Sequence, residues 1–291
     1  MGFIEAIILG LLQGLTEFLP ISSSAHLRIA GEFLPSAQDP GATFTAITQV
    51  GTELAVIIYF RKDIARILSK WFQQFRRPKG AHSVRVDRHD PDVRLGWLVI
   101  IGTIPIVIVG YLFQDSIRSV FRSLWLVAIV LIVFGIILGA ADLLGKKVRS
   151  LDQLTYRDGL IIGFAEMLAL VPGVSRSGAT MTAGRILGYE RPAAARYGFL
   201  LAVPAVFGSG LYELYTALTC DPVTDAAEGC GVGYGLAETA VATVVAFGVG
   251  FAVIAFLMRY IEKRSFLPFV IYRILLGAVL LVLLSLGIIN A

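Results

Sequence analysis

Two short polar clusters, each set near the middle of a long apolar stretch, limit most strongly how this chain can fold. The first runs from Glu17 to His26 and the second from Pro172 to Thr180. A charge at the centre of a bilayer costs ~2.5–3.5 kcal/mol on insertion scales. Non-helical backbone at that depth is tolerated only where protein or a wet cavity covers it. The two clusters are therefore expected to form one buried polar site.

The composition is typical of a polytopic membrane protein. Of the 291 residues, 56% are hydrophobic and 16% are charged, whereas soluble domains carry about 25% charged residues. The formal net charge of +4 does not indicate a nucleic-acid partner, because the basic residues gather in loops between apolar segments. Uninterrupted segments long enough to cross a bilayer lie at 43–60, 95–113, 122–144, 195–217, 236–258 and 266–289.

Two further apolar stretches, 2–34 and 159–188, break at the polar clusters. Each half is too short to cross about 30 Å of hydrocarbon. Both stretches are predicted to be re-entrant hairpins, in which two half-helices meet at a loop inside the bilayer.

Lys and Arg residues orient the chain, because they are enriched in cytoplasmic loops. Loop 61–94 holds ten of them, and loops 145–158 and 259–265 are also basic, so all three should be cytoplasmic. Loop 218–235 has acidic residues and no Lys or Arg, so it should lie outside. The first hairpin would then start and end outside, and the second would start and end inside.

This orientation predicts an all-α polytopic membrane protein, a single integral membrane domain over 1–291 with an inverted-topology repeat. Each repeat, 1–144 and 159–291, would hold one re-entrant hairpin and three transmembrane helices. Such repeats place a site near the midplane, where the broken helices meet. A Gly-x-x-x-Gly spacing precedes each cluster, at Gly10–Gly14 and Gly159–Gly163, and allows close helix packing.

The second cluster is predicted to bind phosphate. Pro172 and Gly173 should end one half-helix, and the next should begin near Ser175. Free N–H groups and the positive dipole end of a helix start form an anion site, and Arg176 adds a fork of donors suited to phosphate oxygens. The alternative is a pair of capping serines beside an Arg that pairs with a nearby acid. The candidate phosphate ligands are Gly173, Ser175, Arg176, Ser177 and Thr180.

The first cluster supplies complementary chemistry. Gln13 and Glu17 are four residues apart and share one helix face, and His26 follows the break. A carboxylate and an imidazole beside hydroxyls can supply a metal ligand, a base and a nucleophile. Glu17 is the candidate ligand for Mg²⁺ or Ca²⁺. His26 could instead be a structural hydrogen-bonding residue, and the serines a redundant helix cap. The hydroxyl candidates are Ser22, Ser23 and Ser24.

Two other features leave alternatives open. Glu53, four residues after Gln49, could pair with Arg176 or another buried Arg, or could be a polar residue that packs between helices. Cys220 and Cys230 share one loop and could be unrelated thiols, or a disulfide if the loop faces an oxidising compartment.

Together the two clusters closely resemble the signature motifs of the undecaprenyl-pyrophosphate phosphatase family, the bacitracin-resistance proteins. The first motif, Glu/Gln-x-x-x-Glu followed by Phe-Leu-Pro-x-Ser-Ser and a His, is matched from Gln13 to His26. The second, Pro-Gly-x-Ser-Arg-Ser-Gly-x-Thr, is matched from Pro172 to Thr180. Ala25 departs from the Gly that the family usually has there. The similarity covers essentially the whole chain and extends to Gln49-Val-Gly51, Gly102-Thr-Ile-Pro105 and Tyr272-Arg273.

The resemblance implies a multi-pass enzyme of the bacterial plasma membrane that hydrolyses undecaprenyl pyrophosphate to undecaprenyl phosphate and inorganic phosphate. This reaction recycles the carrier lipid of peptidoglycan synthesis and confers bacitracin resistance. The site is expected to open toward the extracytoplasmic side, to need a divalent cation (Mg²⁺ or Ca²⁺) and to bind a polyprenyl pyrophosphate whose tail lies against the apolar spans.

The residues expected to carry the reaction are Glu17, Ser23, His26 and Arg176, with Ser23 as a nucleophile that His26 activates. Direct attack by water with His26 as the base is the alternative route. From the residues alone, a lipid-phosphate or anion transporter is the rival function, because inverted repeats with broken helices are also a transporter architecture. Whether the chain forms a homo-oligomer is left open.

Overall fold

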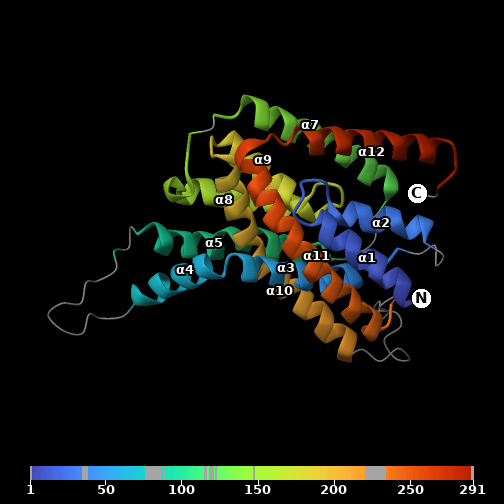
Figure 1. Ribbon diagram of the computed structural model, residues 1–291, viewed down its shortest axis with the longest axis horizontal. Coiled ribbons are helices and arrows are strands. Elements are labelled where there is room, and N and C mark those ends of the chain that lie inside the picture. Colours follow the sequence, from blue (N-terminus) through green and yellow to red (C-terminus); the bar gives the residue numbers. More distant parts are fainter. Residues whose placement is uncertain are drawn as a thin grey trace.

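The computed structural model shows a helical protein, drawn in Figure 1 with its longest axis horizontal. The structure describes residues 2–34, 39–75, 87, 90–114, 117, 121, 123–146, 148–219 and 234–289. Cys220 and Cys230, with the question of their disulfide, lie outside these residues. The described part of the chain holds helices and no β-strand longer than an isolated bridge.

Six helices in the described chain are long and apolar enough to cross a membrane. Each one overlaps one of the six predicted segments, so the prediction of an all-α polytopic membrane protein is confirmed. Two of them, α7 and α12, lie side by side along one edge of the molecule (Figure 1). The six are α3 (Gly41–Tyr59), α5 (Pro91–Leu112), α7 (Leu124–Leu144), α10 (Arg191–Thr219), α11 (Leu236–Lys263) and α12 (Leu267–Ser285).

Short helices flank both polar clusters, as the hairpin prediction requires. Residues 17–22 of the first cluster separate α1 (Phe3–Thr16) from α2 (Ser23–Phe33), which begins within the cluster. Residues 172–175 of the second cluster lie between α8 (Tyr156–Met167), which continues into the 3-10 turn η3 (Leu168–Leu170), and α9 (Arg176–Ile186), which begins within the cluster. At about 1.5 Å per residue, each helix is shorter than the ~30 Å of hydrocarbon. The opposite insertion of the two halves, and with it the inverted repeat, stays a prediction.

Glycines let the first half-helix of each pair press against a long helix. A Cβ atom on Gly10 of α1 would lie 2.5 Å from the carbonyl oxygen of Ala242 in α11, and one on Gly163 of α8 would clash with the backbone of Gly102 in α5. Only hydrogen fits at such distances. The two Gly-x-x-x-Gly spacings therefore serve the close packing that they predict, α1 on α11 and α8 on α5.

Helix α4 (Arg61–Gln73) lies in what the sequence predicted as a loop. Its Trp71 packs against Gly96 at the start of α5, and Lys70 pairs with Asp92 at 2.8 Å. The hydrogen bond with Asp92 raises the pKa of Lys70 above its usual value. Phe72, the residue after Trp71, is 56% exposed. Such a short helix, apolar on part of its surface and rich in Lys and Arg, is typical of the membrane interface.

Buried ion pairs centred on Asp142 of α7 tie four helices together and hold the far end of α9. Arg185 of α9 donates to Asp142 Oδ1 at 3.1 Å, and Arg191 of α10 donates to the same oxygen at 2.7 Å. The backbone N–H of Phe266, just before α12, donates to Asp142 Oδ2 at 3.1 Å. Because breaking a buried pair costs about 3–5 kcal/mol, this anchor fixes the position of the C-terminal end of α9.

Replacing Gly10 with Ala should separate α1 from α11 and lower the stability of the protein. Forcing a methyl group into a packed contact costs about 1–3 kcal/mol, which a thermal unfolding midpoint in detergent would register. Gly248→Ala on α11 is the matched control, because a Cβ atom there meets nothing within 4 Å. Equal midpoints for the two variants would contradict the close packing.

Candidate active site

The helices α2 and α9 begin with the same unusual backbone geometry. Ser22 and Ser175, the residues just before them, have φ angles of 74° and 71°, and in the described chain no other non-glycine residue has a positive φ. Each serine caps its helix: Ser22 Oγ accepts from the N–H of Ala25 at 3.4 Å, and Ser175 Oγ accepts from that of Gly178 at 3.1 Å. Such φ angles cost about 1–3 kcal/mol and cluster at functional sites.

The two hairpin tips touch, so the clusters form one polar site, as the sequence predicts. The N–H of Gly173 donates to Ser22 Oγ at 3.1 Å across 151 residues of sequence. In the other direction, Ser177 Oγ donates to the carbonyl oxygens of Glu17 and Leu19 at 3.3 and 3.1 Å. The Gly173 amide, a predicted phosphate ligand, is thus engaged in joining the tips.

Arg273 of α12 forms hydrogen bonds with both hairpin tips. Its side chain is fully buried and donates to the carbonyl oxygens of Pro20, Gly173 and Val174 at 3.1, 2.7 and 3.1 Å. It also donates to the carbonyl oxygen of Leu131 in α7 at 3.3 Å. Each helix break leaves carbonyl groups without a helical partner. On both tips, such carbonyl groups accept hydrogen bonds from the one guanidinium of Arg273.

Glu17 links the predicted catalytic groups through hydrogen bonds to its carboxylate. Its Oε2 accepts from Gln13 Nε2 at 2.7 Å, from Ser23 Oγ at 2.6 Å and from Gln49 Nε2 at 3.5 Å. The other end of Gln49 accepts from Arg176 Nη2 at 3.3 Å. One hydrogen-bonded chain thus runs from Ser23 through Glu17 and Gln49 to Arg176, across both clusters and α3.

Several buried polar atoms near these hydrogen-bonded residues have no hydrogen-bond partner among the residues that the structure describes. Glu53 of α3 and Glu166 of α8 are both buried, and each lies within electrostatic range of Arg176. Since buried polar groups in folded proteins are normally paired, these atoms are unused binding capacity for an ion, a phosphate or water. They are Nε and Nη1 of Arg176, Oε1 of Gln13, Oε1 of Glu53 and both carboxylate oxygens of Glu166.

His26 makes two hydrogen bonds, and neither of them is to Ser23. Its Nδ1 lies 2.7 Å from the carbonyl oxygen of Ser22, and its Nε2 lies 2.7 Å from the hydroxyl of Tyr272. The two rings stack with an interplanar angle of 8°. The Ser23 hydroxyl donates its hydrogen bond to Glu17 and not to His26, so the structure shows a different partner for Ser23 from the one in the predicted pair.

The remaining predicted ligands lie in the same place, with their hydroxyls bonded inside the protein. Ser24 bonds with Ser22 at 3.2 Å, and Ser175 bonds with Ser177 at 3.1 Å. Thr180 bonds back to carbonyl oxygens of its own helix at 3.0 and 3.2 Å. Their contact with a substrate stays a prediction.

Two residues of the site had no role in the sequence interpretation. Glu166 stands three residues after Gly163, as Glu17 stands three residues after Gly14. That repeated spacing was the signal that could have found it. The signal for Arg273 was a single charge in the middle of an apolar segment, which is normally functional or buried in protein.

A model of the family "Bacitracin resistance protein BacA" matches residues 6–279, which include both polar clusters. The chain belongs to the BacA family. Undecaprenyl-diphosphatases from Clavibacter michiganensis subsp. michiganensis and Micrococcus luteus are 64% and 61% identical to it, each along 100% of both chains. Undecaprenyl-diphosphatase 2 from Agrobacterium fabrum is 54% identical over 100% of this chain and 99% of its own. The predicted family membership is confirmed.

Replacing Arg273 with Gln should loosen both tips of this BacA-family protein. Each buried carbonyl left without a donor costs about 1–3 kcal/mol, so we expect a lower unfolding midpoint. Amide hydrogen exchange should also speed up in 17–22 and 171–175. Arg264→Gln, at an exposed position after α11, is the control and should change neither. Unchanged exchange at the tips in the Arg273 variant would contradict its fastening role.

Proposed function

We propose that this chain hydrolyses undecaprenyl diphosphate to undecaprenyl phosphate and inorganic phosphate at the contact between its hairpin tips. Membership of the BacA family supports this function, as do relatives named undecaprenyl-diphosphatase that match along the full length. The observation that carries it is the hydrogen-bonded chain from Ser23 through Glu17 and Gln49 to Arg176. This chain brings a hydroxyl, a carboxylate and a guanidinium together, which supports a site with a nucleophile, a proton acceptor and a phosphate-binding cation.

Arg176 holds the terminal phosphate in this reaction. Two of its three side-chain nitrogens have no acceptor among the described residues, and it is the first residue of α9, whose positive dipole end favours an anion. Phosphoryl transfer is mostly positioning and neutralisation of charge. The hydroxyls of Ser175, Ser177 and Thr180 are bonded within the protein and shape the start of α9 on which this phosphate is held.

Ser23 is the nucleophile in one of two routes. Glu17 accepts its proton while Ser23 Oγ bonds to phosphorus and undecaprenyl phosphate leaves, and water then hydrolyses the phosphoserine. In the other route Ser23 only orients a water that attacks phosphorus directly. Mass-spectrometric trapping of phosphoserine at Ser23 distinguishes the two.

The donor set fits a divalent cation that is held partly by the substrate. Glu17 supplies a carboxylate, and Oε1 of Gln13 beside it has no partner. In the described chain no three His, Cys, Asp or Glu side chains lie close enough to form a metal site of their own. Mg²⁺ is commonly bound by one or two carboxylates together with substrate phosphates. When bound at Glu17, such a cation neutralises phosphate charge.

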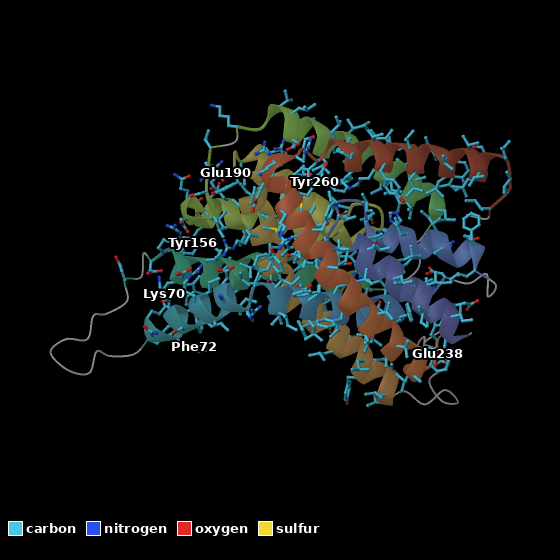
Figure 2. All side chains as sticks on the ribbon, in the orientation of Figure 1. Lys70, Phe72, Tyr156, Glu190, Glu238 and Tyr260 are labelled. Carbon is cyan, nitrogen blue, oxygen red and sulfur yellow. The ribbon has the colours of Figure 1, made fainter. Side chains whose placement is uncertain are left out.

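The protein is a multi-pass membrane protein, and the bacterial plasma membrane is its proposed location, with the site open to the extracytoplasmic side. Figure 2 shows Lys70, Tyr156 and Glu190 at one end of the molecule and Glu238 at the opposite end. The first group adjoins the basic loops predicted to be cytoplasmic, and Glu238 adjoins the acidic loop predicted to lie outside. The matching contacts of α1 with α11 and of α8 with α5 support the inverted repeat.

A transporter function is not favoured. A carrier needs no nucleophile, whereas Ser23 is hydrogen-bonded to a carboxylate at 2.6 Å. A pure transporter would release no phosphate from a polyprenyl diphosphate in detergent, where there is no second compartment.

Arg176→Ala should lower phosphate release from undecaprenyl diphosphate by about 10²–10³-fold, the usual loss when one transition-state donor is removed. The assay uses purified protein in detergent, with a thermal melt to confirm folding. Arg157→Ala, at an exposed position in α8, is the control and should keep full activity. A wild-type rate for the Arg176 variant would refute its role.

Removing divalent cations with a chelator should abolish phosphate release, and adding back Mg²⁺ or Ca²⁺ should restore it. A Glu17→Gln variant should lose rate in the covalent route, where Glu17 accepts the Ser23 proton, and its residual activity should need a higher cation concentration for half-maximal rate, because its side chain no longer carries charge. Activity that survives exhaustive chelation would exclude the cation from the reaction.

A further inference from the structure

His26 has no free ring nitrogen. Its Nδ1 faces the carbonyl oxygen of Ser22, which can only accept a hydrogen bond, so the neutral ring carries its proton on Nδ1. Its Nε2 is then an acceptor, and the hydroxyl of Tyr272 donates to it at 2.7 Å. A base held in this way cannot take a proton from water directly unless one of these bonds breaks.

Tyr272 is placed to carry that proton. Its hydroxyl proton points to His26, which leaves the lone pairs of its oxygen free to accept from water. Tyr272 is 43% exposed, so the helices packed around it leave part of its side chain uncovered. The next residue, Arg273, is bonded to both hairpin tips. His26 lies three residues after Ser23 on α2, and residues at that spacing are neighbours on a helix surface.

We propose that Tyr272 is a further catalytic residue, a proton relay between the attacking water and His26. This inference rests on the proposed function. The water proton passes to the phenolic oxygen while the phenolic proton passes to Nε2 of His26. The water oxygen bonds to phosphorus, and the bond from phosphorus to the leaving oxygen breaks.

The leaving group depends on the route, and the relay serves both. In direct hydrolysis the leaving group is undecaprenyl phosphate. In the covalent route it is Oγ of Ser23, which takes back the proton that Glu17 received in the first step. Tyr272 ends neutral and His26 ends as an imidazolium, with its Nδ1–H still bonded to Ser22, and it then returns the extra proton to solvent.

The test is phosphate release by wild type and Tyr272→Phe in mixtures of H₂O and D₂O. Phe keeps the ring and removes only the hydroxyl. We expect kcat to fall about 10²-fold, at the low end for general acid–base catalysis, with KM unchanged. The wild-type rate should curve downward with D₂O fraction, because two protons move together, and the variant should show a linear dependence. Tyr260→Phe, which removes a hydroxyl bonded to the Ser265 carbonyl oxygen at the end of α11 (Figure 2), is the control.

A double-mutant cycle with His26→Gln separates a relay from a structural role. Because both residues act on one proton, the double variant should be no slower than His26→Gln alone. Multiplicative losses, or a Tyr272→Phe enzyme with the wild-type rate, would overturn the relay. Replacing Tyr272 by 3,5-difluorotyrosine keeps the hydrogen bond and the fold, so an unchanged pH–rate profile there would also overturn it. Absence of phosphate release from wild type would instead defeat the proposed function.

Discussion

A single buried guanidinium holds the two broken helices of this protein together. A break in a helix inside a membrane leaves carbonyl groups without partners, and no water is at hand to pair with them. Arg273 bonds to such carbonyls on both tips and to one more on α7. Its charge is spread over backbone dipoles, and the positions of Ser23 and Arg176 relative to each other depend on this contact.

The polar atoms of the site fall into two groups with different tasks. The hydroxyls of Ser22, Ser175 and Ser177 are bonded to the protein, and they cap helices or join the tips. Arg176 and Glu166 keep buried atoms without partners, and these are the atoms that a diphosphate and its counter-ions can use. The motif residues therefore divide into those that build the site and those that are free to bind in it.

Much of this could be predicted from the sequence, because membrane insertion leaves few choices. Apolar lengths identified the six spans of the described chain, and the Pro and Ser residues identified both breaks. The sequence does not predict helix α4, because a run rich in basic residues indicates a cytoplasmic loop whether or not it is helical. The fastening role of Arg273 was missed because its partners are backbone carbonyls, which no side-chain pattern reveals. The sequence predicted His26 as the partner of Ser23, but it could not show that the Tyr272 hydroxyl lies within hydrogen-bond distance of the imidazole.

A high-resolution experimental structure with a non-hydrolysable methylenebisphosphonate analogue of the lipid would decide whether both hairpins serve one reaction centre. One phosphonate should lie within hydrogen-bond distance of Arg176, with its phosphorus beside Ser23 Oγ and the tail among the apolar helices. Phosphonates bound away from Arg176, or in contact with only one hairpin, would contradict a site shared by the two tips.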